Sequence, residues 1–315
     1  MAVDPIAEAI LADLGPAGKP RIETQPPQAV RRAARETKLM FAGEPEPIAD
    51  MHDLVIDRPG GPIPARIYRS LARDVQTSAL PLLVYFHGGG WMMGDLDTHD
   101  QLCRRLANLT GGVIFAIDYR LAPEHKFPAA VDDALASVEW AVRNHQALGV
   151  DGARISVGGD SAGANLAAVT SLANRGSKDV RIRSQVLFYP VFDLSLRYAE
   201  TCQIDGNFSL TYSTLVWFRG LYLRDAGDQR DWRASPLLAE RLDDLPPALI
   251  VTAQYDPLHL EAFEYVRRLQ DSHVRTTHIH MNDQCHGFLN SGTYNAKKRE
   301  IMRMIAAAIR YQWAS

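Results

Sequence analysis

The segment Gly159-Asp160-Ser161-Ala162-Gly163 is the part of this sequence most clearly suited to chemistry. It follows a short apolar run, residues 155–157, and precedes a stretch of helical character, residues 164–174. A serine on a tight turn between a strand and a helix has its hydroxyl exposed at the end of a sheet, and the flanking glycines let the two elements approach closely. The pattern also occurs in ordinary glycine-rich turns, so the prediction of Ser161 as a nucleophile depends on the rest of the chain.

A serine hydroxyl is a weak nucleophile at neutral pH and needs a base, which a third group must orient. Histidine is the usual base because its pKa lies near neutrality. Asp256 follows a predicted strand that ends near Ala253, and His286 follows one that ends near Met281. Since the carboxyl ends of parallel strands meet at one edge of a sheet, the sequence predicts a catalytic triad of Ser161, Asp256 and His286.

A third group of residues could bind the negative charge that develops on a carbonyl oxygen. Phe86-His87-Gly88-Gly89-Gly90-Trp91 directly follows an apolar run that reads as a buried strand. Consecutive glycines let backbone N–H groups turn toward one point with no side chain in the way. We therefore expect an oxyanion hole formed by the N–H group of Ala162 and by this glycine loop, with Gly89 and Gly90 favoured over Gly88.

The elements that would position these residues alternate along the chain. Residues 54–56 and 63–68 flank a turn with Gly60 and Gly61, which predicts a hairpin. Further strands are predicted at 82–86, 113–117, 155–157, 186–189, 248–252 and 276–281, and helices at 98–108, 129–144, 164–174, 260–269 and 296–311. Repeated strand–helix units predict an α/β fold with a mostly parallel central sheet and helices on both faces.

Two segments do not fit the alternation and are expected to form a helical cap. Residues 5–14 and about 27–41 are predicted helices ahead of the first strand, within residues 1–45. The insert 192–238 is long, rich in aromatic residues and lies between two strands; such a length usually marks a lid, although it could simply extend the core. The core would then comprise residues 46–191 and 239–315. Candidate residues for lining a substrate pocket are Trp91, Met92, Phe192, Trp217, Phe218 and Leu258.

Composition describes an ordinary soluble globular protein. Of 315 residues, 46% are apolar and 23% are charged, with a net charge of −3. Nucleic acids and anionic membranes select basic surfaces, so neither is an expected partner. No stretch approaches the roughly 18 apolar residues that span a bilayer. The three cysteines are widely spaced and form no Cys-x-x-Cys motif, which favours a reducing, cytoplasmic location.

Several other polar residues have a simpler explanation than catalysis. We expect Asp160 to be structural, and Cys285 to be a packing thiol rather than a reactive one. His278 and His280 could lie on one face of a strand, but the sequence places no third metal ligand near them, so no metal is predicted. Loop hydrogen bonds or ion pairs that support the site are expected for Asp118, Arg120 and Glu124.

Taken together, these motifs resemble the hormone-sensitive lipase-like branch of the α/β-hydrolase fold. The resemblance rests on the segments 87–91, 118–124, 159–167, 256–258 and 286–288. It implies ester hydrolysis through an acyl-enzyme, no cofactor, a helical cap, and substrates with short to medium acyl chains. The chain departs from the family at Ala164, where a second glycine is common, and at residues 283–285, where Gly-Met-x is common.

The sequence therefore predicts a serine carboxylesterase that acts on small soluble esters. A serine hydrolase acting on amides, lactones or carbamates is the first alternative, because all these reactions share the same acyl-transfer chemistry. A non-catalytic ligand-binding homologue is the second. Plant gibberellin receptors resemble this branch but lack the catalytic histidine, whereas this chain has His286. The oligomeric state is left open, a homodimer included.

Overall fold

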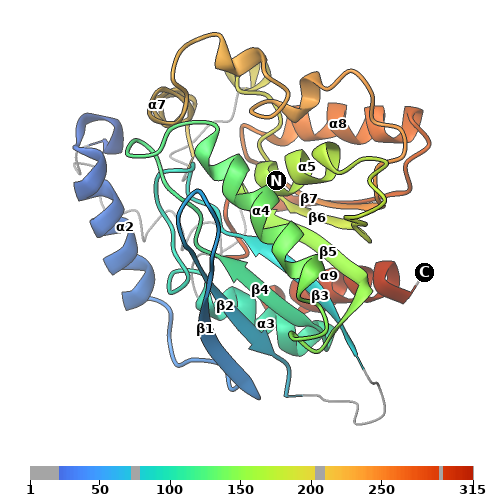
Figure 1. The fold of residues 1–315 in the computed structure, drawn as a ribbon. Coiled ribbons are helices and arrows are strands. Elements are labelled where there is room, and N and C mark those ends of the chain that lie inside the picture. The colour runs from blue at the N-terminus through green and yellow to red at the C-terminus, as the bar shows by residue number, and fades with distance from the viewer. Residues whose placement is uncertain (1–20, 72–78, 203–209, 291–293, 315) are drawn as a thin grey trace.

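The computed structural model describes residues 21–71, 79–202, 210–290 and 294–314. In this part of the chain one sheet of eight strands runs in the order β1-β2-β4-β3-β5-β6-β7-β8 (Figure 1). The strands are β1 Asp50–Ile56, β2 Ile63–Arg69, β3 Leu80–Phe86, β4 Val113–Ile117, β5 Val150–Asp160, β6 Gln185–Phe188, β7 Ala248–Tyr255 and β8 Thr276–Cys285. All the strands predicted from the sequence are present.

The helices predicted from the sequence are also present, apart from the one over residues 5–14, which lies outside the described residues; the short helix over residues 197–201 was not predicted. They are α2 Pro27–Met40, α3 Asp100–Thr110, α4 Ala129–Arg143, α5 Ala162–Ala173, α6 Arg197–Thr201, α7 Tyr212–Tyr222, α8 His259–Asp271 and α9 Ala296–Ala314. Short 3-10 turns lie at Ile22–Thr24, Asp228–Arg230 and Pro236–Leu238. No helix in the described ranges has the length and apolar character needed to cross a bilayer.

Most of the sheet is parallel. From β4 through β8 every neighbouring pair is parallel, while the hairpin β1–β2 is antiparallel and β2 joins β4 in the antiparallel sense. In the centre, Val84 of β3 lies between Phe115 of β4 and Val157 of β5. This topology confirms the predicted α/β-hydrolase architecture and places several strand ends at the same edge.

Both faces of the sheet are covered, as the continuous apolar strands predicted. Because side chains alternate along a strand, Leu82, Val84 and Phe86 pack into a core under α4, α5 and α8, while Leu83 and Tyr85 pack into a second core under α3 and α9 (Figure 1). All five of these side chains are buried. The central strands are therefore held rigidly where their carboxyl ends meet.

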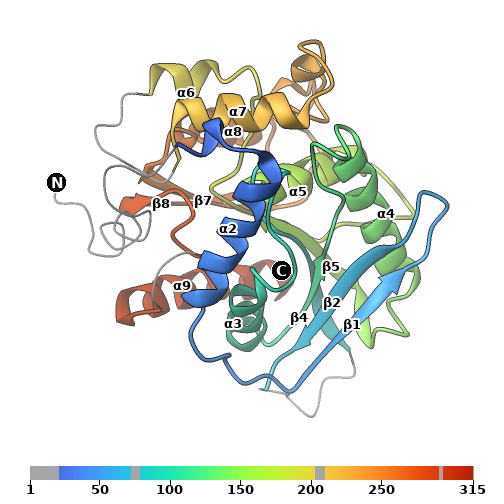
Figure 2. The same cartoon turned by 90° about the vertical axis from the view of Figure 1, so that its left-hand side faces the viewer.

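The two segments expected to form a cap lie next to each other. Figure 2 shows α2 across the face that is turned to the viewer, with its beginning next to α7. Just ahead of α2, Glu23 accepts a hydrogen bond of 2.5 Å from the Ser213 hydroxyl of α7, and Arg21 donates one to the same hydroxyl at 2.5 Å. The domain limits themselves stay a prediction.

The turn between β5 and α5 is tight because β3 lies directly against it. A Cβ atom at Gly159 would lie 2.4 Å from the carbonyl oxygen of Phe86, and one at Gly163 would lie 2.0 Å from the same oxygen. Real Cβ atoms do not approach a carbonyl oxygen so closely, so both positions require glycine. Ser161, between them, has φ of 54°, which is rare for a residue with a side chain.

We expect Gly163→Ala to lower the free energy of unfolding by at least about 2 kcal/mol, because the new methyl group has no room against β3. Gly220→Ala in α7 is the matched control. A Cβ there meets no atom within 4 Å, so the change should be neutral or stabilise the helix by about 0.5–1 kcal/mol. Thermal and urea unfolding of both variants would check this, and equal stabilities would contradict the steric argument.

Candidate active site

Ser161 lies at the end of β5, and α5 begins at the next residue. Its backbone N–H donates to the carbonyl of Phe188 at the end of β6, at 2.8 Å, and its own carbonyl accepts from the N–H of Asn165 at 3.1 Å. These bonds hold a backbone conformation that would otherwise be unfavourable. The turn therefore presents the Ser161 hydroxyl at the carboxyl edge of the sheet.

Asp256 and His286 reach the same edge from the two strands farthest from the hairpin. Strand β7 ends at Tyr255 and β8 ends at Cys285, and these two residues are partners in the parallel register. Asp256 and His286 therefore come directly after paired strand ends. Both strands run farther than the sequence predicted, which had placed their ends near residues 253 and 281.

The three predicted triad side chains form one line of hydrogen bonds. His286 Nδ1 lies 2.8 Å from Asp256 Oδ2, and His286 Nε2 lies 2.9 Å from Ser161 Oγ. Asp256 is 1% exposed, and its other oxygen accepts from the N–H of Leu258 at 2.9 Å. A carboxylate bound to Nδ1 keeps the proton there, so the lone pair of Nε2 faces the serine hydroxyl. In this arrangement the imidazole can take the hydroxyl proton.

The glycine loop follows β3 and passes beside the turn that carries the serine. Gly89 and Gly90 have φ of 121° and 60°, a region that side chains disfavour. The N–H of Gly88 donates to Asp160 Oδ1 at 3.0 Å and is therefore occupied. Within the described residues no hydrogen bond takes up the N–H groups of Gly89 and Gly90. Ala162 opens α5, where a backbone N–H has no partner inside the helix.

Phe218, a predicted pocket residue from the insert, lies against the glycine loop. A Cβ at Gly90 would lie 2.5 Å from the ring of Phe218, so this ring of α7 covers the loop. Trp217 is next to it, with ring centroids 5.3 Å apart. Trp91 is 2% exposed and stacks on Tyr222 of α7, with centroids 4.3 Å apart, so this face of the indole packs against the insert.

The remaining predicted pocket residues are buried around the same edge. Phe192 stacks on Tyr265 of α8, with centroids 3.9 Å apart. Leu258 is buried two residues beyond Asp256, and Met92 is buried at the end of the glycine loop. Contact between any of these side chains and a substrate stays a prediction.

Arg120 and Glu124 both form ion pairs, as predicted. Arg120 pairs with the buried Asp133 at 2.7 Å, and Glu124 pairs with Arg31 at 2.7 Å. His278 and His280 both hydrogen-bond the hydroxyl of Thr252, each at 2.8 Å. In the part of the chain that the structure describes, no group of three or more histidine, cysteine or acidic side chains is arranged to hold a metal ion. Cys285 is buried and forms no disulfide.

Sequence reasoning gave Arg31 and His99 no role, yet both lie close to the glycine loop. Arg31 Nε donates to the carbonyl of Met92 at 2.7 Å, and His99 Nε2 lies 3.3 Å from the N–H of Gly88. Neither residue belongs to a local motif. The one available signal is that Arg31 and Arg35 are four residues apart and so share one face of α2.

Comparison with known proteins agrees with this geometry. Residues 83–290 match the family model for the alpha/beta hydrolase fold. The chain is 36% identical over 285 residues to an ethyl acetate hydrolase of Pseudomonas putida, covering 89% of this chain and 88% of that one. It is 35% identical to an arylesterase of Saccharolobus solfataricus, covering 90% of each. It is also 42% identical to the carboxylic ester hydrolase LipN of Mycobacterium tuberculosis, of whose length it spans 66%.

A solved structure shows the same fold over the full length. The hyperthermophilic esterase from the archaeon Pyrobaculum calidifontis superimposes with a TM-score of 0.90 at 40% identity, covering 100% of both chains. Fold, motifs and relatives thus agree, and the chain belongs to the hormone-sensitive lipase-like family of carboxylic ester hydrolases, with the α/β-hydrolase fold.

Proposed function

We propose that this protein hydrolyses small esters of short to medium acyl chain through an acyl-enzyme formed on Ser161. The observation that carries the proposal is the unbroken hydrogen-bond line from Asp256 through His286 to Ser161, with distances of 2.8 and 2.9 Å. Distances of this size allow direct proton transfer without movement of the backbone. The backbone donors next to the serine supply the second requirement of acyl transfer.

Acylation starts when Ser161 Oγ attacks the ester carbonyl carbon while His286 Nε2 takes the hydroxyl proton. The negative charge of Asp256 stabilises the imidazolium that results. The carbonyl oxygen becomes an oxyanion, which the N–H groups of Ala162, Gly89 and Gly90 bind. When the tetrahedral intermediate collapses, the bond to the alcohol oxygen breaks and His286 gives its proton to that oxygen, so the alcohol leaves.

Deacylation repeats the same steps with water. His286 takes a proton from water as the water oxygen attacks the acyl carbon, and the same N–H groups bind the second oxyanion. Collapse breaks the bond to Ser161 Oγ, which recovers its proton from His286, and the carboxylic acid is released. General acid–base assistance of this kind contributes about 10²–10⁴ in rate.

The preference for small acyl groups is supported by the packing above the glycine loop. Phe218 lies against Gly90 and restricts the space next to the proposed oxyanion donors. Two relatives carry names for small substrates, ethyl acetate and aryl esters. Amides, lactones and carbamates need the same triad, so a panel of these compounds beside matched esters separates the alternatives.

Ser161→Ala is expected to lower kcat on a short p-nitrophenyl ester by at least about 10³, because the acyl-enzyme can no longer form. Steady-state kinetics would measure the loss, and an unchanged melting temperature would show that the fold is intact. Wild-type enzyme treated with an organophosphate should carry one label, on the peptide that contains Ser161. Retained turnover in the variant, or a label on another residue, would reject Ser161 as the nucleophile.

Phe218→Ala should shift the preference toward longer acyl chains, because removing the ring opens space over Gly90. The ratio of kcat/KM for an octanoyl ester to that for an acetyl ester is expected to rise at least about fivefold, the effect of roughly 1 kcal/mol of packing. Tyr212→Ala, at the exposed start of the same helix, should leave the ratio unchanged. A ratio that responds equally to both changes would remove Phe218 from the acyl pocket.

A further inference from the structure

The glycine loop, residues 88–92, is bound at both ends by charged side chains that the proposed chemistry does not use. At its start, the N–H of Gly88 donates to Asp160 Oδ1 at 3.0 Å. At its end, the carbonyl of Met92 accepts from Arg31 Nε at 2.7 Å. The two proposed oxyanion donors, Gly89 and Gly90, lie between these fixed points.

Asp160 precedes the proposed nucleophile but does not point toward the substrate side of the turn. Its carboxylate is nearly fully buried, with Oδ1 also accepting from the Tyr85 hydroxyl at 2.8 Å and Oδ2 lying 3.4 Å from His99 Nε2. A Cβ at Gly88 would lie 2.4 Å from Oδ2, so the carboxylate and the loop backbone are in close contact. This one side chain therefore connects the serine turn with the glycine loop.

The charge of Asp160 strengthens that connection. Burial by itself would raise the pKa of Asp160, but His99, the ammonium of Lys38 and the Tyr85 hydroxyl together hold this pKa well below its usual range. A low pKa favours the ionised form of this carboxyl group. A hydrogen bond to an ionised acceptor is roughly twice as strong as a neutral one, so the N–H of Gly88 is held firmly.

Arg31 holds the other end of the loop from helix α2. Its guanidinium donates to the carbonyls of Met92 at 2.7 Å and Ala122 at 2.8 Å, and it pairs with Glu124 at 2.7 Å. Because a guanidinium is planar and Glu124 fixes its orientation, the Nε–H points at the loop in one direction. A lysine could not make these contacts together.

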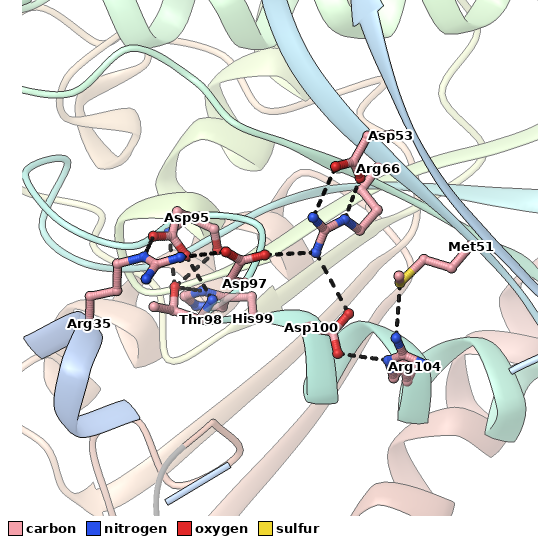
Figure 3. A network of polar contacts seen from close by, with 10 residues as sticks. All are labelled: Arg35, Met51, Asp53, Arg66, Asp95, Asp97, Thr98, His99, Asp100 and Arg104. Carbon is pink, nitrogen blue, oxygen red and sulfur yellow. Dashed lines mark hydrogen bonds and ion pairs between the residues drawn. The ribbon is translucent and has the colours of Figure 1, made fainter. Parts of the chain in front are cut away.

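The two ends are connected through the segment that follows the loop. Figure 3 shows Arg35, one helical turn beyond Arg31, paired with Asp95 and Asp97. Asp95 accepts from the N–H of Thr98 at 2.7 Å, and the Thr98 hydroxyl lies 3.1 Å from His99 Nδ1. Polar contacts thus run from α2 to Asp160.

Strand β2 holds the same segment from another side. Arg66 lies 3.0 Å from Asp97 and also pairs with Asp53 of β1, as Figure 3 shows. Residues 95–99 are therefore anchored to α2 through Arg35 and to the sheet through Arg66.

We propose that Asp160 and Arg31 are positioning residues that hold the glycine loop so that the N–H groups of Gly89 and Gly90 converge on the oxyanion. The inference rests on the proposed function and extends it to two residues that touch neither substrate nor proton. Glycine backbone is intrinsically mobile, and an oxyanion donor is effective only within about 2.7–3.1 Å of the oxygen. Loosening either end of the loop should therefore weaken binding of the transition state more than binding of the substrate.

The test compares Arg31→Ala and Asp160→Ala with wild-type enzyme on a short p-nitrophenyl ester. Each variant is expected to lose at least about tenfold in kcat, a part of the 10²–10³ that removing one donor costs, with little change in KM. Asp160→Asn keeps an acceptor for the N–H of Gly88 but loses the charge, so its loss should be intermediate. Arg32→Ala, at the exposed neighbouring position of α2, is the matched control and should keep wild-type kinetics.

Binding of two ketones separates positioning from a general structural role. A trifluoromethyl ketone adds to the serine and leaves an oxyanion in the hole, whereas its non-fluorinated counterpart largely binds without adding. The variants should bind the trifluoromethyl ketone more weakly by about the factor lost in kcat and should bind the plain ketone as the wild type does. If both ketones weaken equally, or if kcat is unchanged in a folded variant, the proposal is wrong.

Combining the changes tests whether the two residues act on the same loop. The double variant Arg31→Ala/Asp160→Asn should lose less than the product of the single losses, because one released end already lets the loop move. Fully multiplicative losses would overturn a shared role.

If Asp160→Ala does not fold, Asp160→Asn takes its place, and an unchanged affinity for the trifluoromethyl ketone in that variant would overturn the proposal. Failure of the proposed function itself would be seen separately, as wild-type enzyme that an organophosphate does not label at Ser161.

Discussion

The close approach of the β5–α5 turn to the end of β3 is the constraint on which the rest of the site depends. The carbonyl oxygen of Phe86 lies too close to both Gly159 and Gly163 to leave room for a Cβ atom at either position. The turn and the strand are therefore in direct backbone contact. Phe86 is also the residue at which β3 ends and beyond which the glycine loop begins. One steric requirement thus holds the serine, which is half-buried, in its strained turn and brings the glycine loop beside it. The serine and the glycine loop are one structural unit, although about 70 residues separate them.

The proposed base, His286, and its partner Asp256 are positioned by a different principle. Asp256 and His286 follow neighbouring parallel strands whose last residues are partners in the register, so sheet hydrogen bonding alone brings the two side chains together. The distance of 2.9 Å between His286 Nε2 and Ser161 Oγ then depends on β6, which lies between the serine strand and these two strands. Hydrophobic cores on both faces of the sheet keep this register fixed, and the geometry of the proposed triad depends on that rigidity.

Burying charged residues around the glycine loop is unfavourable in free energy, because these groups lose their hydration. Asp160 is an ionised carboxylate with 4% exposure, and removing such a group from water is unfavourable unless hydrogen bonds replace the lost hydration. The Tyr85 hydroxyl, the Gly88 N–H and the His99 imidazole supply these bonds. His99 lies in turn next to the segment that Arg35 holds from α2. Polar contacts therefore connect helix α2, which is predicted to be part of the cap, to the residues that surround the glycine loop.

The sequence by itself determined the elements and the identity of the candidate triad. Apolar periodicity and turn residues are local properties. The order of serine, aspartate and histidine, each directly after a predicted strand, can also be found in the sequence. The structure decided which polar groups meet. Three contacts show this, and each joins residues that are far apart in sequence. The N–H of Gly88 donates to Asp160, Arg31 donates to the carbonyl of Met92, and Trp91 stacks on Tyr222. Tertiary packing decides where a side chain points and which acceptor a donor binds. Each donor binds the acceptor that the fold brings within about 3 Å, and a local sequence pattern does not specify which residue that is.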